Sequence, residues 1–192
     1  MNNVLVLDTE TGGLYPDINS LLEVALSPLE GGFPDFESLV YDPTGITYVQ
    51  ALEVNKIKRE DISSFPHIND VAVELTAYLE AFAADQGIAV KDIQIAGHNV
   101  GTFDAPFMRR MFDRGLPWSH RYIDTASLLW AAAEVGLIPK KPEGMSLSSF
   151  GFTVLGATRD GEGRGRHSAM GDVMATKRML VRLLNLFARS NG

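Results

Sequence analysis

The hydrophobic pattern of the first forty residues predicts three short strands joined by turns. Apolar runs at residues 4–7 and 21–26 are separated by a pair of glycines at 12–13, which is typical of a turn. The sequence at 30–32, Glu-Gly-Gly, predicts a hairpin turn into a third strand near residues 36–41. We therefore expect three antiparallel strands to open the fold.

The rest of the chain alternates short strands with helices. Apolar residues between 68 and 84 recur with roughly helical spacing, and Gly87 follows as a stop signal. The later predicted segments are a strand at 93–96, a helix at 105–114 ended by Gly115, a strand-to-helix passage at 122–133 and a long helix at 168–189. This succession, with three strands at the start and strand–helix units after them, predicts an α/β fold with a mixed sheet and helices packed against it.

Length and composition indicate one domain without cysteine chemistry. With 192 residues and 45% hydrophobic content, the chain is expected to form a single domain over residues 1–192. It contains no cysteine, which excludes disulfide bonds and thiolate zinc sites. No apolar run is long enough to cross a bilayer, and the N-terminus lacks the basic and apolar regions of a signal peptide. We expect a cytoplasmic protein with no membrane partner.

The acidic charge balance narrows the partners that the chain can bind by charge alone. A net charge of −7 argues against broad, non-specific binding to duplex nucleic acid, which depends on a field of lysine and arginine. It does not exclude a nucleic-acid enzyme, because bound divalent cations neutralise carboxylates where phosphates approach.

Two carboxylates follow the first apolar run at positions that share one side of a strand. Asp8 and Glu10 are separated by one residue, and strand side chains alternate between faces. Like charges held this close repel each other, so the pair favours a bound cation between them. The structural alternative is a pair of acidic residues that ends a strand before a turn.

Further acidic residues stand at predicted helix starts. Asp104, taken alone, is expected to cap the helix that follows it, and Asp124 has the same cap-like setting. Asp172 lies in the first turn of the last helix, five residues after His167. The segment 156–166 combines four glycines with three arginines, which predicts either a solvated loop or a flexible clamp for phosphate groups.

Together these residues resemble the DEDDh family of 3′–5′ exonucleases, which includes bacterial polymerase proofreading subunits and exonuclease I. Three motifs carry the resemblance in the family's order: residues 7–14, then His98-Asn99 with Phe103-Asp104, then His167 with Asp172. The three residues between Asn99 and Phe103 are similar to the longer second motif of exonuclease I. Residues 51–57 also match a family segment between the third strand and the first long helix.

The resemblance implies a ribonuclease H-like fold, with a mixed five-stranded sheet flanked by helices. It implies a metal-dependent enzyme that removes nucleoside 5′-monophosphates from the 3′ end of single-stranded or frayed DNA. The implied ligands of two Mg²⁺ or Mn²⁺ ions are Asp8, Glu10, Asp104 and Asp172, and the implied general base is His167. The implied substrate-binding residues are Thr11, Gly12, Gly13, Leu14, Asn99, Phe103 and Arg166. A polymerase or another replication or repair protein is the implied protein partner.

Three other interpretations remain open from the sequence. An RNA-trimming exoribonuclease would use the same active-site chemistry, and no sequence pattern clearly indicates recognition of the ribose 2′-hydroxyl that distinguishes RNA from DNA. A non-catalytic nucleic-acid-binding module would keep the fold, although all five catalytic positions are present here. An ordinary α/β protein would use its acidic residues only as helix caps and turn residues.

Overall fold

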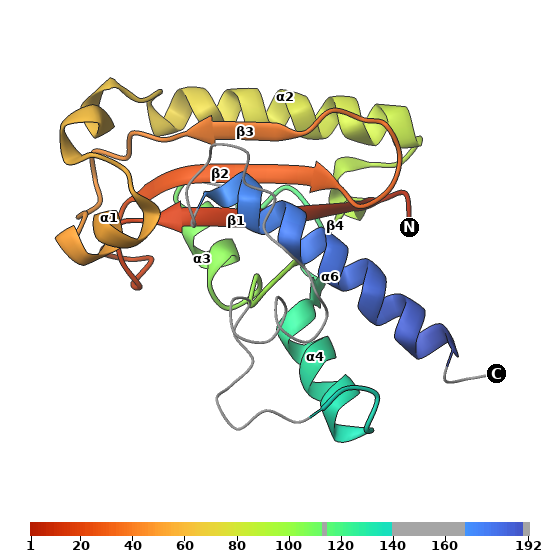
Figure 1. The fold of residues 1–192 in the computed structure, drawn as a ribbon. Coiled ribbons are helices and arrows are strands. Elements are labelled where there is room, and N and C mark those ends of the chain that lie inside the picture. The colour runs from red at the N-terminus through yellow and green to blue at the C-terminus, as the bar shows by residue number, and fades with distance from the viewer. Residues whose placement is uncertain (113–114, 140–167, 190–192) are drawn as a thin grey trace.

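The fold is built on a five-stranded mixed sheet with the strand order β3-β2-β1-β4-β5 (Figure 1). The computed structural model describes residues 1–112, 115–139 and 168–189. The strands are β1 (Val4–Thr11), β2 (Leu21–Pro28), β3 (Phe36–Leu39), β4 (Gln94–Gly97) and β5 (Tyr122–Asp124). The first three pair antiparallel, whereas β4 and β5 run parallel to β1. The predicted mixed sheet with an antiparallel opening is therefore confirmed.

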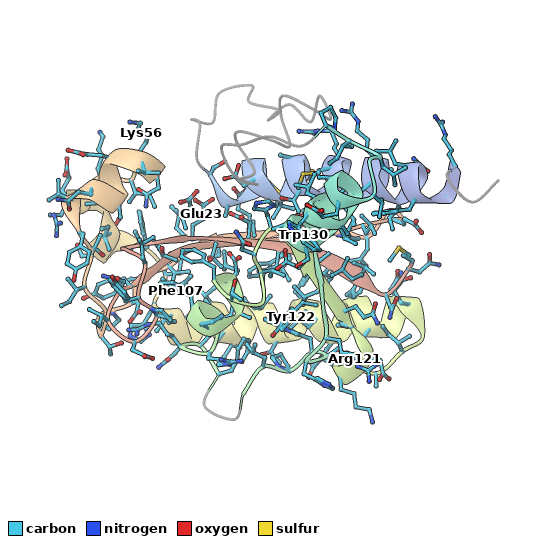
Figure 2. All side chains as sticks on the ribbon, turned by 90° about the horizontal axis from the view of Figure 1, so that it is seen from below. Glu23, Lys56, Phe107, Arg121, Tyr122 and Trp130 are labelled. Atoms are coloured by element: carbon cyan, nitrogen blue, oxygen red, sulfur yellow. The ribbon has the colours of Figure 1, made fainter. Side chains whose placement is uncertain are left out.

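Helices cover both faces of this sheet. The α-helices are α1 (Val49–Asn55), α2 (Ile68–Gln86), α3 (Asp104–Met108), α4 (Thr125–Glu134) and α6 (Ala169–Arg189), and two 3₁₀ turns span Arg59–Ser64 and Val90–Asp92. Figure 2 shows α2 and α6 on opposite sides of the sheet. None of the described helices combines the length and hydropathy that crossing a bilayer requires.

The central strand β1 is buried on both faces, which explains its continuous apolar run. Leu5 and Leu7 belong to the cluster that packs against α2, whereas Val4 and Val6 belong to the cluster that packs against α6. Side chains alternate along a strand, so Asp8 and Glu10 continue the side of β1 that faces α6. The hydrophobic pattern of β1 thus fixes the side of the sheet on which its two carboxylates emerge.

Two predicted elements are shorter in the structure. The helix predicted at 105–114 is α3, which ends at Met108. Beyond it the backbone amides of Arg110, Met111 and Phe112 bond carbonyls three residues back, so the chain tightens into turns of 3₁₀ type. The strand predicted at 36–41 ends at Leu39, because Tyr41 forms an isolated bridge with His67 at the start of α2.

The long helix α2 agrees with its prediction at both ends. His67 caps its start by accepting a hydrogen bond at Nδ1 from the amide of Asn69. Gly87 ends it in the left-handed region, with a φ of 67°, which glycine adopts without a steric penalty. The stop signal in the sequence is therefore a C-cap.

Candidate active site

Three carboxylates from opposite ends of the chain meet at the carboxyl end of β1. One ligand oxygen from each of Asp8, Glu10 and Asp172 lies within 4.8 Å of the other two. Asp8 and Glu10 come from β1, and Asp172 is a buried residue in the first turn of α6. Carboxylates crowd together in this way at sites that bind cations, because a positive ion offsets their repulsion.

The first turn of α6 is held in place by packing and by a serine. Ala169 and Val173 are fully buried in the cluster that includes Val4 and Val6 of β1. Ser168 Oγ accepts a hydrogen bond of 3.2 Å from the amide of Gly171, which satisfies one of the free amides at the helix start. These contacts fix Asp172 above the end of β1.

Asp104 lies beside this group and is bonded to β1, which corrects the expectation that it caps α3. The N-cap residue is Phe103, and no side-chain capping bond is formed there. Instead Asp104 Oδ1 accepts bonds from the backbone amide of Thr9, at 2.9 Å, and from Thr9 Oγ1, at 2.7 Å. The sequence could not show this, because the contact joins residues 95 positions apart.

The electrostatics of the group favour a bound cation. Burial raises the pKa of Asp8 well above its ordinary value, and the charges of Asp104, Asp172, Glu10 and Glu23 raise it further. Burial also raises the pKa of Asp104 to about 7, although the hydrogen bonds from Thr9 act in the opposite direction. Protons or metal ions are therefore needed to stabilise this concentration of negative charge.

Glu23 is a fifth acidic residue at the site, and it was missed in the sequence. It lies on β2 directly opposite Glu10 in the antiparallel register and is only 7% exposed. Figure 2 shows Glu23 beside the start of α6. The one available signal was an acidic residue inside the otherwise apolar run at 21–26, but strand pairing was needed to place it.

The predicted substrate-binding segment 11–14 forms a tight turn. Thr11 is buried, and its Oγ1 donates a 2.6 Å hydrogen bond to the carbonyl of Gly13. The amide of Gly12 donates to Ser20, and its carbonyl accepts from Tyr48, so both groups are bonded within the protein. A Cβ added at Gly12 would lie 2.7 Å from the carbonyl oxygen of Ile46, which explains the need for glycine.

Exposed apolar side chains surround this turn. Leu14 is 72% exposed and Tyr15 is 61% exposed. We use the name apolar rim for this set of residues: Leu14, Tyr15, Ile18, Ile46, Tyr48 and Val49. Its members come from two chain segments that are joined by hydrogen bonds, including Ile46 N to Ile18 O and Tyr48 N to Gly12 O. Such exposed apolar residues on a bonded framework are typical of a binding surface.

The second motif organises a turn between β4 and α3. Asn99 adopts the left-handed region with a φ of 60°, and its carbonyl accepts from the amides of Thr102 and Phe103. The side chain of Asn99 is exposed. Asp124 caps α4 as expected, by accepting from Ala126, and also accepts from the amide of Asn99. This turn places Asp104 at the start of α3.

Phe103 of the second motif and Phe107 of α3 have different roles in packing. Phe103 is partly buried, and its ring lies 5.3 Å from that of Phe107, measured between ring centroids. Phe107 is fully buried in the core, so it cannot form a wall of a binding surface. The predicted base His167, the predicted substrate contact Arg166 and the glycine–arginine segment 156–166 lie outside the described residues.

A comparison with protein families identifies the family of this chain. The family model described as Exonuclease matches residues 5–180. The chain belongs to this exonuclease family. Membership confirms the resemblance that the three motifs indicate, and it makes the chain a member of a family of enzymes that cut nucleic acids.

Known relatives of this family member are much longer proteins. It is 29% identical over 128 residues to the PolC-type DNA polymerase III of Thermotoga maritima, a match that covers 65% of this chain and 8% of the polymerase. The corresponding polymerase of Thermotoga petrophila is 27% identical over the same length. The chain thus spans less than a tenth of these relatives.

Solved structures show the same fold. Escherichia coli exonuclease I, in complex with a 5cy-dT13 oligonucleotide, matches with a TM-score of 0.72 at 18% identity over 97% of this chain and 42% of that one. Exonuclease I of Methylocaldum szegediense matches with a TM-score of 0.70 at 16% identity over 95% of this chain and 40% of its own. The expected ribonuclease H-like architecture is therefore confirmed.

Proposed function

We propose that this chain is a divalent-metal-dependent 3′–5′ exonuclease that removes nucleoside 5′-monophosphates from single-stranded or frayed DNA ends. The observation that carries the proposal is the convergence of Asp8, Glu10 and Asp172 within 4.8 Å in a member of the exonuclease family. The raised pKa of Asp8 supports it, because a group of like charges is stabilised when cations bind.

The described carboxylates fit Mg²⁺ or Mn²⁺. These are hard cations that prefer oxygen ligands, and the clustered groups offer only carboxylate oxygens. We assign Asp8, Glu10, Asp104 and Asp172 as the ligands of two such ions, and the charge of Glu23 strengthens the field that attracts them. Bound cations supply an activated water and stabilise the charge that develops on the phosphate and the leaving oxygen.

His167 is the proposed general base. An imidazole titrates near neutral pH, so it can accept the proton of the attacking water under ordinary conditions. The assignment rests on the sequence, since His167 stands five residues before Asp172. Water attacks the last phosphodiester, the bond from phosphorus to the 3′ oxygen breaks, and a shortened 3′-hydroxyl end remains.

The apolar rim supports a single-stranded substrate. Unpaired bases expose their faces, and they gain about 1–3 kcal/mol each by stacking on aromatic side chains such as Tyr15 and Tyr48. Leu14, which is 72% exposed, is proposed to wedge against the terminal base. Asn99, Phe103 and Arg166 are proposed to contact the same nucleotide. The net charge of −7 disfavours tracking along duplex DNA.

The relatives support one proposal about the substrate of this chain and one about its protein partner. Escherichia coli exonuclease I was crystallised in complex with single-stranded DNA, which supports a DNA strand as the substrate here. The PolC-type relatives are polymerases, which supports recruitment of this domain by a polymerase or by another replication or repair protein in the cytoplasm.

Digestion of end-labelled oligonucleotides tests the proposed function. Single-stranded DNA carrying a label at its 5′ end should yield a ladder that shortens from the 3′ end with Mg²⁺ or Mn²⁺, and no ladder with EDTA. Duplex DNA and RNA of the same sequence, digested in parallel, measure the preference for single strands and for DNA. Faster cleavage of the RNA would make the chain an exoribonuclease.

Variants assign the residues in the same assay. Asp8→Asn and Asp172→Asn should abolish cleavage, and His167→Ala should slow it while metal binding persists. Asp17→Asn removes an exposed carboxylate from the loop after β1 and serves as the matched control. Parental cleavage by both Asp8→Asn and Asp172→Asn would refute the proposed site.

A further inference from the structure

Arg110 joins three separate segments of the chain through one guanidinium group. It lies two residues beyond the end of α3, and its Nε donates a 2.6 Å hydrogen bond to Asp42 Oδ2. Its Nη1 donates to the carbonyl of Pro16 at 2.7 Å, and its Nη2 donates to Thr44 Oγ1 at 2.8 Å. Three donors of a rigid, planar group are thus used on three different acceptors.

The ion pair at the centre of this junction is nearly buried. The side chain of Asp42 is 1% exposed and that of Arg110 is 15% exposed. Asp42 Oδ1 also accepts bonds from the amide and the hydroxyl of Thr44. Burial acts to raise the pKa of Asp42, but the hydrogen bonds from Arg110 and Thr44 outweigh it and hold the pKa below its ordinary value. The acceptor therefore stays charged and keeps its bonds to both partners.

The junction connects the apolar rim with the element that carries a catalytic carboxylate. Pro16 follows directly on Leu14 and Tyr15, and Thr44 lies in the segment that leads to Ile46 and Tyr48. These two segments are also tied to each other by Asn19, whose Oδ1 accepts from the amide of Tyr15 and whose Nδ2 donates to the carbonyl of Ile46.

On its other side, Arg110 belongs to the turn that continues α3. That helix begins at Asp104, which is bonded to Thr9 of β1. A bound strand would touch the apolar rim with its terminal base and the carboxylates with its last phosphodiester. The distance between these two surfaces decides where the reacting bond falls, and a displacement of 1 Å can cost about 100-fold in rate.

We propose that Arg110 is a positioning residue that sets the apolar rim at a fixed distance from the carboxylate site, so that the last phosphodiester is aligned for cleavage. The inference rests on the proposed exonuclease function. It assigns to Arg110 no contact with the substrate. Arg110 acts on the position of the apolar rim through its hydrogen bonds to Pro16 and Thr44. This positioning role is distinct from any contribution that the ion pair with Asp42 makes to folding stability.

The variant Arg110→Lys separates positioning from folding. A lysine keeps the positive charge beside Asp42, but a single ammonium group cannot reproduce the three directed bonds. We expect kcat/KM on a single-stranded oligonucleotide to fall about 10- to 100-fold. The increase in thermal midpoint on adding Mg²⁺ should be unchanged, because no carboxylate of the site is altered.

Two further variants complete the test. Arg109→Lys is the matched control, because Arg109 is the neighbouring exposed arginine, and it should cleave at the parental rate. Thr44→Val keeps the shape of the side chain but removes one acceptor of Arg110, so it should give an intermediate loss. It also serves as the probe if Arg110→Lys does not fold.

The outcomes distinguish this inference from the proposed function. A parental chain that cleaves no oligonucleotide would refute the function and the inference together. A parental chain that is active, with Arg110→Lys and Thr44→Val as active as Arg109→Lys, would refute the inference alone. A loss of the Mg²⁺-dependent thermal shift in Arg110→Lys would also overturn it, since the metal site itself would then depend on the arginine.

Discussion

Replacing Asp8 by asparagine should stabilise the metal-free protein while abolishing its response to metal. Ligand oxygens of Asp8, Glu10 and Asp172 lie within 4.8 Å of one another, and two unit charges 4.8 Å apart repel by about 3.5 kcal/mol at an effective dielectric constant of about 20. The raised pKa of Asp8 means that protonation already relieves part of this repulsion. We therefore expect Asp8→Asn to gain about 1–2 kcal/mol in the free energy of unfolding, or about 2–8 °C in thermal midpoint.

The response to Mg²⁺ should change in the opposite direction. At a free Mg²⁺ concentration about 100 times Kd, binding stabilises the folded parental chain by about 2.7 kcal/mol, which corresponds to about 5–11 °C. Asp8→Asn removes a carboxylate that we propose as a metal ligand, so most of this shift should disappear. The thermal midpoint of Asp8→Asn should therefore be higher than the parental midpoint in EDTA and lower than it in Mg²⁺.

Thermal unfolding followed by circular dichroism, in EDTA and in a Mg²⁺ titration, measures both effects. The control Asp17→Asn makes the same chemical change at an exposed position, and its free energy of unfolding should stay within about 0.5 kcal/mol of the parental value in both conditions. A variant Asp8→Asn that is less stable than the parent in EDTA, or that keeps the full Mg²⁺ shift, would refute the electrostatic account of the site.

Three other predictions concern residues around the carboxylates. Burial raises the pKa of Asp104 to about 7, so the folded chain binds this proton more tightly than the unfolded chain does. In EDTA the free energy of unfolding should fall as pH rises from about 4 to about 7, by up to about 4 kcal/mol, and Asp104→Asn should flatten the profile measured by urea unfolding. An equally steep profile in that variant would assign the dependence to other groups. Gly12→Ala places a Cβ 2.7 Å from the carbonyl oxygen of Ile46 and should cost about 1–3 kcal/mol in urea unfolding, whereas an unchanged midpoint would contradict the close packing. Leu14→Ala should leave stability within about 0.5 kcal/mol but raise KM for an oligonucleotide about fivefold or more, while Val73→Ala, equally exposed on α2, should change neither quantity. An unchanged KM in Leu14→Ala would remove Leu14 from the substrate surface.

The parts of the site that follow from local periodicity could be predicted from sequence. Asp8 and Glu10 share a side of β1 because the side-chain period of a strand is two, and an apolar run marks where the strand lies. Asp124 was correctly expected to cap α4, because a cap depends only on residues close in sequence. The succession of strands and helices along the chain followed from the switch between strand and helix patterns.

The parts that depend on contacts across the sheet could not be predicted in this way. Glu23 faces Glu10 only through the register of β1 with β2, and a shift of one residue would move it to the other face. Asp104 matched a helix cap in its local sequence, but folding brings Thr9 within reach, and two bonds from Thr9 replace the capping role. Arg110 likewise gave no signal, since its acceptors lie 66–94 residues away.

The threonine between the two acids of β1 also bears on the choice of cation. Both bonds from Thr9 fall on the same oxygen of Asp104, Oδ1, and a carboxylate oxygen has two lone-pair directions to offer. As a proposed metal ligand, Asp104 would then offer only Oδ2 to an ion, so it would coordinate through one oxygen. Mg²⁺ is satisfied by single oxygens in an octahedral shell, whereas Ca²⁺ takes up to eight ligands and often binds both oxygens of a carboxylate. In the proposed metal site, Thr9 would therefore favour small, six-coordinate ions over calcium.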